Sequence, residues 1–275
     1  MNNQLTLRPL RLVAIAATLT TGLLTGISNA ASPADQRAAT LNKAIPAAMQ
    51  RASIPGAIVG IWQDGSEPYV LTFGVRDTAT REKMATDLQL RIGSSSKTFT
   101  VTAILMLADQ GKLSLDDPIG RYVEGVPGGD QITLRQLAEM RSGLYNYADD
   151  TNPKLPQEPF RQWTPDELLA IAFSHKPLFP PGSAFDYSNT NTVLLGVVVE
   201  KVSGQSLKSF IEQNILKPEG LAHTVFPAGT EFPSPHSQGY FKLPDGKIVD
   251  ATDWNPSWGD PRPRSGAASH PTEIR

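Results

Sequence analysis

A serine and a lysine three residues apart form the most informative pair in the sequence. Ser94 and Lys97 lie in residues 91–100, which read Arg-Ile-Gly-Ser-Ser-Ser-Lys-Thr-Phe-Thr. If Ser94 opens a helix, the two side chains lie one turn apart on the same face, close enough to meet. A serine hydroxyl is a poor nucleophile until a base takes its proton, and a desolvated lysine can be that base. The spacing therefore predicts covalent catalysis through Ser94.

The structural alternative is that Ser94 caps the helix and Lys97 is a solvated cation of its first turn. Chance supplies on the order of one S-x-x-K in a chain of this length, so the pair needs support from its context. Residues 98–108 are apolar almost all round, which is typical of a buried helix, and Gly111 offers a C-cap. The amide of Ser94 would lie in the first turn, where unpaired N–H groups favour a developing oxyanion. This context favours the catalytic interpretation.

A tyrosine and an asparagine form the second candidate group. Tyr187 and Asn189 lie in Phe-Asp-Tyr-Ser-Asn, after the turn Pro-Pro-Gly-Ser that ends at Ser183. Two residues apart on an irregular loop, they point to the same side and supply a proton-transferring phenol and an amide that can hold a substrate. In the structural alternative, Tyr187 packs and Asn189 caps the following helix, because asparagine is a preferred N-cap.

Four blocks of sequence, in this order, resemble the beta-lactamase-related serine hydrolases, a group that includes D-alanyl-D-alanine carboxypeptidases, class C beta-lactamases and related esterases. The blocks are Gly-Ser94-Ser-Ser-Lys97-Thr-Phe, Leu113-Ser-Leu-Asp-Asp-Pro-Ile, Ile132-Thr-Leu-Arg-Gln-Leu-Ala-Glu-Met-Arg-Ser-Gly-Leu144 and Pro181-Gly-Ser-Ala-Phe-Asp-Tyr187-Ser-Asn189-Thr-Asn191. The resemblance covers about residues 41–258. It implies that Ser94 is the nucleophile and Lys97 its base. It also implies that Tyr187 is the acid/base partner and that Asn189 contacts a substrate amide.

The resemblance also implies a fold: an α/β (α+β) domain in which helices flank an antiparallel sheet and a mostly helical lobe faces it across the site. The most direct functional expectation is an exported D-alanyl-D-alanine carboxypeptidase-like hydrolase acting on a small-molecule or peptide substrate. A catalytically impaired, truncated relic or a penicillin-binding module is the alternative, and a beta-lactamase or an esterase is a further one.

A third element of this family has no match in the sequence. Relatives carry a Lys-Thr-Gly or His-x-Gly strand beyond the tyrosine block; Lys-Thr-Gly does not occur here, and His236-Ser-Gln-Gly239 has the wrong spacing. Residues 259–275 are rich in proline and arginine with few apolar residues, and we expect them to be disordered or out of frame. Residues 31–258 are therefore expected to form an incomplete catalytic domain, with an unpaired sheet edge and low activity.

Composition and net charge show which other classes of function the sequence excludes or does not indicate. With 40% hydrophobic and 19% charged residues, the chain can bury the core of one globular domain. A net charge of −2 gives no indication of a nucleic-acid partner. There is no cysteine, so disulfides and a thiol nucleophile are excluded. No His/Asp/Glu cluster has ligand spacing, and neither a metal nor another cofactor is implied.

The first thirty residues have the pattern of a signal peptide. Arg8 and Arg11 precede an apolar run over residues 12–24, and Ser-Asn-Ala ending at Ala30 resembles a cleavage site. The run is short for a membrane span, so we expect cleavage near Ala30 and no stable membrane anchor. The expected location is secreted, extracellular or in the cell envelope.

Periodicity and turn residues predict the remaining elements. The expected elements are a helix over 33–52, a hairpin of strands 56–63 and 68–75 joined at Asp64-Gly65, a buried helix after Ser94, a short helix from Thr133 broken at Ser142-Gly143, a loop over 146–159 near the site, a helix starting at Thr164-Pro-Asp-Glu, and helices over 189–202 and 207–216. Tyr145 and Tyr147 could line the cleft and stack on a substrate, or could be ordinary packing aromatics.

Overall fold

The computed structural model describes residues 33–64, 68–226, 230, 232–258, 268 and 269. Contacts divide the chain into two units, residues 1–41 and 42–275, and every residue of the site lies in the second. The helices are α1 (Pro33–Ala52), α2 (Ser96–Asp109), α3 (Leu134–Ala138), α4 (Ala148–Thr151), α5 (Pro165–Ser174), α6 (Asn189–Ser203) and α7 (Leu207–Ile211). The strands are β1 (Gly56–Ile61), β2 (Tyr69–Gly74), β3 (Leu90–Arg91), β4 (Tyr240–Lys242), β5 (Ile248–Asp250) and β6 (Ala268–Ser269). Short helical turns complete the list: η1 (Gly93–Ser95), η2 (Ile119–Arg121), η3 (Asn152–Lys154), η4 (Glu212–Leu216) and η5 (Pro256–Trp258).

The strands form small antiparallel sheets. β1 pairs with β2 in the predicted hairpin, from Gly56 opposite Gly74 to Ile61 opposite Tyr69. β3 pairs with β6, and β4 pairs with β5. The mixed fold class is confirmed, although the described strands form three separate pairs where a single sheet was expected.

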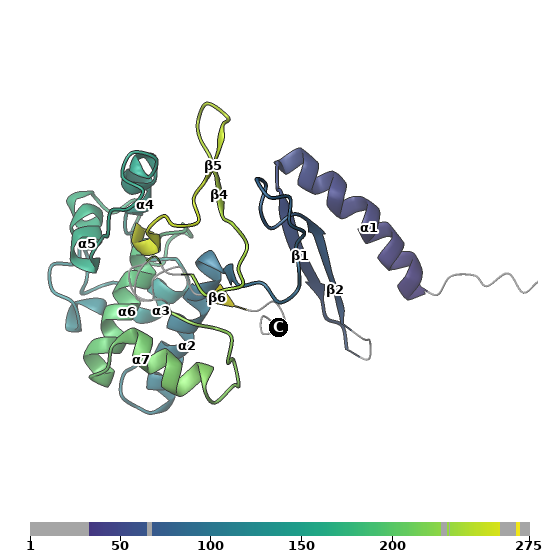
Figure 1. The fold of residues 1–275 in the computed structure, drawn as a ribbon. Coiled ribbons are helices and arrows are strands. Elements are labelled where there is room, and N and C mark those ends of the chain that lie inside the picture. The colour runs from purple at the N-terminus through teal and green to yellow at the C-terminus, as the bar shows by residue number, and fades with distance from the viewer. Residues whose placement is uncertain (1–32, 65–67, 227–229, 231, 259–267, 270–275) are drawn as a thin grey trace, which may run out of the picture. The chain divides into compact units, whose positions relative to one another are not determined.

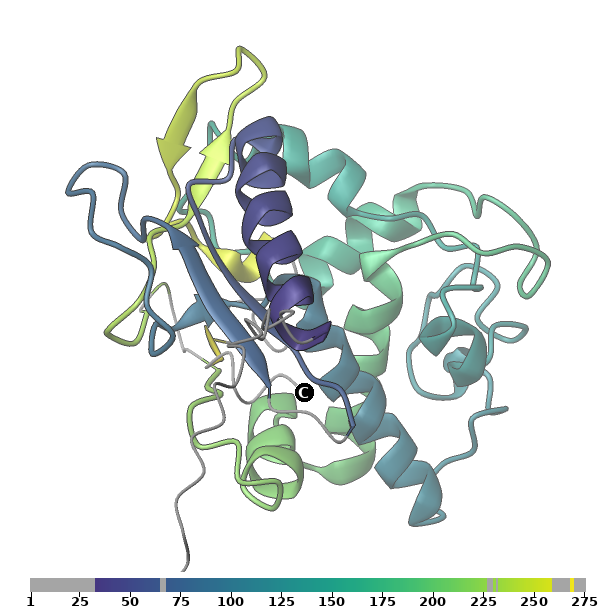
Figure 2. The same ribbon diagram turned by 90° about the vertical axis from the view of Figure 1, so that its right-hand side faces the viewer.

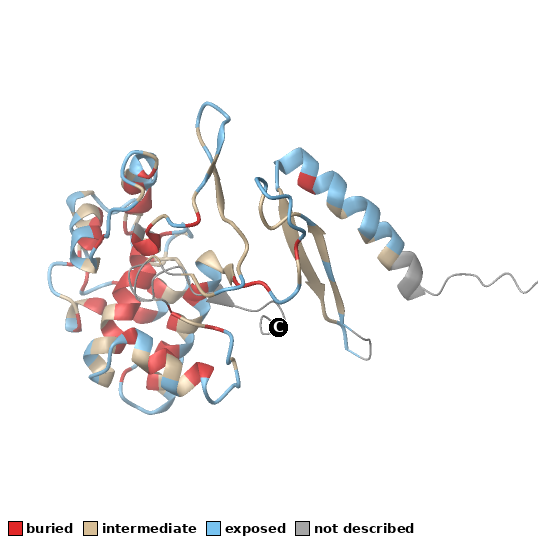
Figure 3. Ribbon diagram, viewed as in Figure 1, coloured by how far each residue is buried: buried red, intermediate tan, exposed pale blue. Residues whose placement is uncertain are grey.

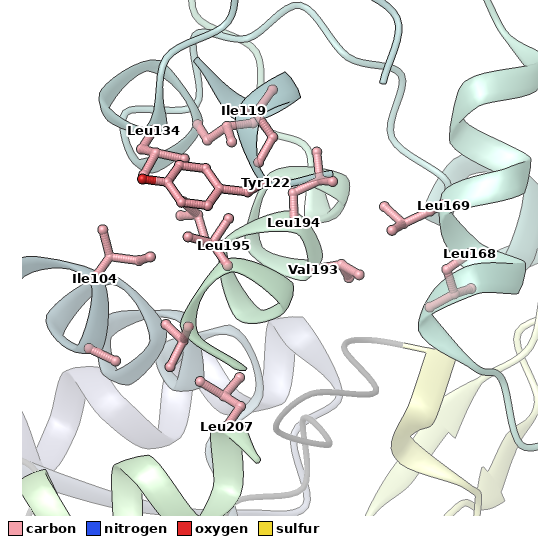
Figure 4. Close-up of a cluster of buried hydrophobic side chains, with 14 of the residues drawn as sticks. Ile104, Ile119, Tyr122, Leu134, Leu168, Leu169, Val193, Leu194, Leu195 and Leu207 are labelled. Atoms are coloured by element: carbon pink, nitrogen blue, oxygen red, sulfur yellow. The ribbon is translucent and has the colours of Figure 1, made fainter. Parts of the chain in front are cut away.

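A helical body around α6 holds the core (Figures 1 and 2). α6 packs against α2, α3, α5 and α7. Figure 3 shows buried residues concentrated in these helices, whereas β1 is only half-buried along its length. Side chains from several helices meet in the core, among them Ile104 of α2, Leu134 of α3 and Leu194 of α6, all fully buried (Figure 4). Burial of each such side chain stabilises the fold by about 1.5–3 kcal/mol, so this body is a rigid support for the residues at the ends of α2 and α6.

Local capping explains where two helices begin. Thr133 caps α3 and Thr164 caps α5, and each forms a complete capping box with the residue three positions on, Gln136 and Glu167. Both starts were predicted. α3 is shorter than expected because it ends at Ala138, before the glycine that was expected to break it.

The polar stretch 146–159 is not an irregular loop, so that part of the prediction was wrong, whereas its predicted position near Ser94 is confirmed by Ala148 and Asn152. It contains α4 and η3. Asn146 starts the first turn by accepting from the amide of Ala148 and donating through Nδ2 to Asp149. Short polar side chains that favour turns also stabilise the first turn of a helix, so composition alone suggested a loop.

Helix predictions in the rest of the chain agree with the structure. α1 has the predicted bounds, α6 extends one residue past its predicted end, and α7 continues through the π-helical turn η4 to Leu216. The predicted signal peptide lies outside the described residues. Of the segment 259–275, only β6 is described.

Candidate active site

A left-handed glycine places Ser94 ahead of the buried helix. Gly93 has a φ of 54°, which an L side chain rarely adopts, and η1 follows directly before α2. The N-cap position of α2 is Ser95, and its side chain makes no capping bond. Ser94 therefore does not cap α2, and its hydroxyl is used elsewhere.

The Ser94 hydroxyl receives two hydrogen bonds. Lys97 Nζ lies 3.3 Å from Ser94 Oγ, and Tyr187 OH lies 2.9 Å from the same oxygen. Lys97 is only 7% exposed, on the first turn of α2, and its Nζ lies 5.4 Å from the centre of the Tyr187 ring. The alternative of a solvated lysine is thus excluded. Both neighbours are placed to exchange a proton with Ser94 Oγ, at distances usual for a site without substrate.

Asn189 is the first residue of α6, not its cap. The N-cap position is Ser188, and no side chain there bonds the helix amides. The Asn189 side chain instead donates through Nδ2 to Asn146 Oδ1 over 3.1 Å. The capping alternative is therefore wrong, and the Asn189 amide lines the same cavity as Ser94 and Lys97.

The turn that carries Asn146 is set by a second left-handed glycine. Gly143 has a φ of 77°, and a Cβ at this position would collide with the carbonyl oxygen of Phe179. The preceding Ser142 donates to Asn191 of α6 over 2.6 Å. The helix break predicted at Ser142-Gly143 is thus a turn that brings residues 144–147 against the start of α6.

Tyr145 and Tyr147 do not line the cavity. Tyr147 is fully buried in the core, where an aromatic ring contributes most by packing. The Tyr145 hydroxyl donates to Asp150 over 2.7 Å, and its ring stacks on His175 at 3.7 Å. The hydrogen bond to this carboxylate raises the pKa of Tyr145 to about 12. The structure supports the packing alternative for both tyrosines, contrary to the substrate-binding expectation.

Sequence reasoning missed the importance of Asn146. Its Oδ1 accepts from both the backbone and the side-chain nitrogen of Asn189. The only feature of the sequence that pointed to Asn146 was its position just after the block that ends at Leu144, in a segment expected to lie near the site. The contact joins residues 43 positions apart in the chain, so no local pattern encodes it.

A cavity of about 470 Å³ opens over the Ser94 hydroxyl. Its lining residues are Arg91, Gly93, Ser94, Lys97, Ala148, Asn152, Tyr187, Asn189, Gly239, Tyr240, Phe241, Ala251, Trp254 and Pro256. Two of these described residues, Arg91 and Lys97, have basic side chains and none is acidic. Phe241 and Trp254 contact one another with ring centres 5.1 Å apart and give the cavity an aromatic wall. No group of acidic and histidine residues in the described segments could hold a metal ion.

The family assignment rests on a match that spans most of the chain. The family model described as Beta-lactamase matches residues 41–270, so the protein belongs to the beta-lactamase family of serine hydrolases. The match extends beyond the residues that carried the resemblance in the sequence.

No helix within the described segments has the length and apolar character needed to cross a membrane.

Individual relatives differ in activity. The chain is 28% identical to Protein flp of Staphylococcus aureus over 78% of its own length, but this match spans only 43% of that protein. A D-stereospecific amidohydrolase from Streptomyces sp. is 34% identical, with a TM-score of 0.71 and coverage of 80% of this chain and 65% of the other. The D-alanine carboxypeptidase AmpC from Burkholderia cenocepacia is 28% identical, with a TM-score of 0.63 and coverage of 88% and 63%.

Proposed function

We propose that this protein is an exported serine hydrolase that cleaves an amide bond beside a D-amino acid through an acyl-enzyme on Ser94, most closely as a D-alanyl-D-alanine carboxypeptidase does. The observation that carries the proposal is the pair of proton carriers, Lys97 and Tyr187, within 3.3 Å and 2.9 Å of one serine oxygen. Two solved relatives are described by their specificity for D-compounds, which supports the substrate class. The pattern of residues 1–30 supports export.

The chemistry would proceed in two steps. Lys97 accepts the Ser94 proton as Oγ attacks the scissile carbonyl, and the amide N–H at the start of the helical turn stabilises the oxyanion. Tyr187, which contacts the same oxygen, passes a proton to the departing amine, and the bond to the leaving group breaks. Water then attacks the ester on Ser94 by the reverse proton path and releases the acid.

The charge of the cavity supports a substrate with a free carboxylate. Arg91 belongs to its lining, and no acidic side chain does so among the described residues. A peptide ending in D-alanine places a carboxylate one residue beyond the scissile bond, whereas a D-amino acid amide has none. The positive charge of Arg91 therefore favours the carboxypeptidase over the amidase among D-specific activities.

Substrate comparison tests the proposal directly. The full chain would be incubated with an acyl-D-Ala-D-Ala peptide, its L,L isomer and a D-amino acid amide, with the Ser94→Ala variant as control. Release of D-alanine from the D,D peptide alone, absent in Ser94→Ala, is expected. Cleavage of the L,L isomer at an equal rate, or activity that survives in Ser94→Ala, would contradict the proposal.

A penicillin-binding module that acylates but turns over slowly is the second candidate. It is favoured because the described residues that line the cavity include no Lys/His-x-Gly strand, which in the family supplies one oxyanion donor. Loss of one such donor slows catalysis roughly a hundred- to a thousandfold. A stable adduct with fluorescent penicillin, without D-alanine release, would select this candidate. Rapid release of opened penicillin would indicate a beta-lactamase, and cleavage of a simple ester alone would indicate an esterase.

A further inference from the structure

We propose that Asn146 is a positioning residue that presets the side-chain amide of Asn189 for the substrate. This inference rests on the proposed function, since it concerns how the same site meets the amide of an acylating substrate. Asn146 is not among the residues that line the cavity, so it would act through Asn189 and not on the substrate itself.

The contact between the two asparagines is double. Asn146 Oδ1 accepts from the backbone nitrogen of Asn189 over 3.0 Å and from Asn189 Nδ2 over 3.1 Å. One oxygen thus fixes both the position of the residue and the rotation of its side chain. A single bond to Nδ2 would leave the amide free to turn about its backbone.

The orientation of the Asn146 amide is itself determined by its neighbours. A backbone N–H can only donate, so it must face Oδ1 of Asn146. On the other side, Asn146 Nδ2 lies 3.0 Å from Asp149 Oδ1, and an ionised carboxylate can only accept. If the Asn146 amide were flipped, its Nδ2 would face the donor N–H of Asn189, and its Oδ1 would face the acceptor carboxylate of Asp149. Therefore Nδ2 is the atom of Asn189 that faces Asn146, and this contact sets how the Asn189 amide is presented to a substrate.

Bonds that do not involve the Asn146 side chain hold the surrounding turn. The carbonyl oxygen of Tyr145 accepts from Ser188 Oγ and, over 2.7 Å, from Thr190 Oγ1. Beyond the turn, Asp150 is bonded to both Tyr145 and His175. Shortening Asn146 also removes its bonds to Ala148 and Asp149 in the first turn of α4. Because the other contacts remain, the loss of its amide is expected to free Asn189 without unfolding the turn.

Two acylating probes separate positioning from a general effect on the site. Fluorescent penicillin carries an acylamino group that Asn189 would hold, whereas a small fluorophosphonate reacts with Ser94 and carries no such group. A misplacement of about 1 Å in a substrate-positioning group can slow a reaction about a hundredfold. We therefore expect Asn146→Ala to slow penicillin acylation by about ten- to a hundredfold and to leave fluorophosphonate labelling unchanged.

A charge-swap pair sharpens the test. Asn146→Asp places two carboxylates opposite one another and is expected to slow penicillin acylation. Adding Asp149→Asn restores a donor opposite the new carboxylate, whose oxygens still accept from Asn189, so acylation is expected to recover. The matched control is Asn214→Ala, which removes an asparagine amide bonded at 2.8 Å to the carbonyl of Phe210, away from the site.

Each outcome decides the inference. Selective loss of penicillin acylation in Asn146→Ala, with recovery in the swap, supports it. Unchanged penicillin acylation, or equal loss with both probes, overturns it. If neither probe labels the wild type, the proposed function fails, and the side-chain NH₂ resonances of Asn189 in a nitrogen-15 correlation spectrum decide instead. Resonances that shift in Asn146→Ala and not in Asn214→Ala support positioning, and resonances that stay in place overturn it.

Discussion

Replacing Lys97 with arginine tests whether this residue acts as a general base or only as a fixed positive charge. The amine lies 3.3 Å from Ser94 Oγ, on a residue that is only 7% exposed, so it is placed to accept the serine proton. A guanidinium keeps the positive charge but is not deprotonated in proteins. General-base catalysis contributes about 10²- to 10⁴-fold, which corresponds to about 3–5 kcal/mol of activation free energy. Because Tyr187 still contacts Ser94 Oγ, the smaller value is expected for Lys97→Arg.

The assay is the second-order rate constant for fluorophosphonate labelling, measured beside the melting temperature of each variant. Lys97→Met, whose unbranched side chain is one atom shorter than that of lysine and has no charge or basicity, should lose as much rate as Lys97→Arg. Lys201→Arg is the matched control, since that lysine donates to the carbonyl of Tyr122 away from the site. A labelling rate of Lys97→Arg close to the wild type would refute the assignment of Lys97 as the base and leave it as a fixed cation.

Three further outcomes are expected. Peptide mass spectrometry of protein labelled with either probe should place the adduct on Ser94, and an adduct on a neighbouring serine would disprove the assignment. Leu194→Ala should lower the free energy of unfolding by about 2–5 kcal/mol in denaturant titrations, because Leu194 is fully buried; a change near zero would show that the core repacks. The backbone N–H of Ser114 and then the Tyr122 hydroxyl lower the pKa of Asp117 below its ordinary 3.8. This contribution to stability is present above that value and is lost as the pH falls through the lower folded pKa. Asp117→Asn should therefore remove part of the acid destabilisation seen when melts above pH 3.8 are compared with melts below it; identical acid profiles would contradict it.

The helices near the site were predictable where local chemistry decides them. Helix starts at Thr133 and Thr164 were both predicted, and the capping box of Thr164 with Glu167 forms as the sequence indicated. The apolar run after Lys97 forms α2, with Gly111 in the left-handed conformation that follows its end. These features depend on neighbours within a few positions, which a sequence displays directly.

The roles of the tyrosines and asparagines depended on distant contacts. Tyr145 and Tyr147 are adjacent to Asn146 in the sequence, yet one is bonded to Asp150, one is buried, and only the asparagine reaches the site residue Asn189. Turn and helix compositions overlap for polar residues, which is why α4 was not predicted.

By itself, the sequence determined which groups could do chemistry: a serine and a lysine one helical turn apart, and a tyrosine two residues before an asparagine. Their spacing within each motif is local, so it survives in any fold that forms the helix. Only the tertiary structure decided that Tyr187 lies 2.9 Å from Ser94, since this contact joins residues 93 positions apart. It depends on how α6 packs against α2 and α3, and that packing is set by the burial of many side chains together, which no single segment specifies.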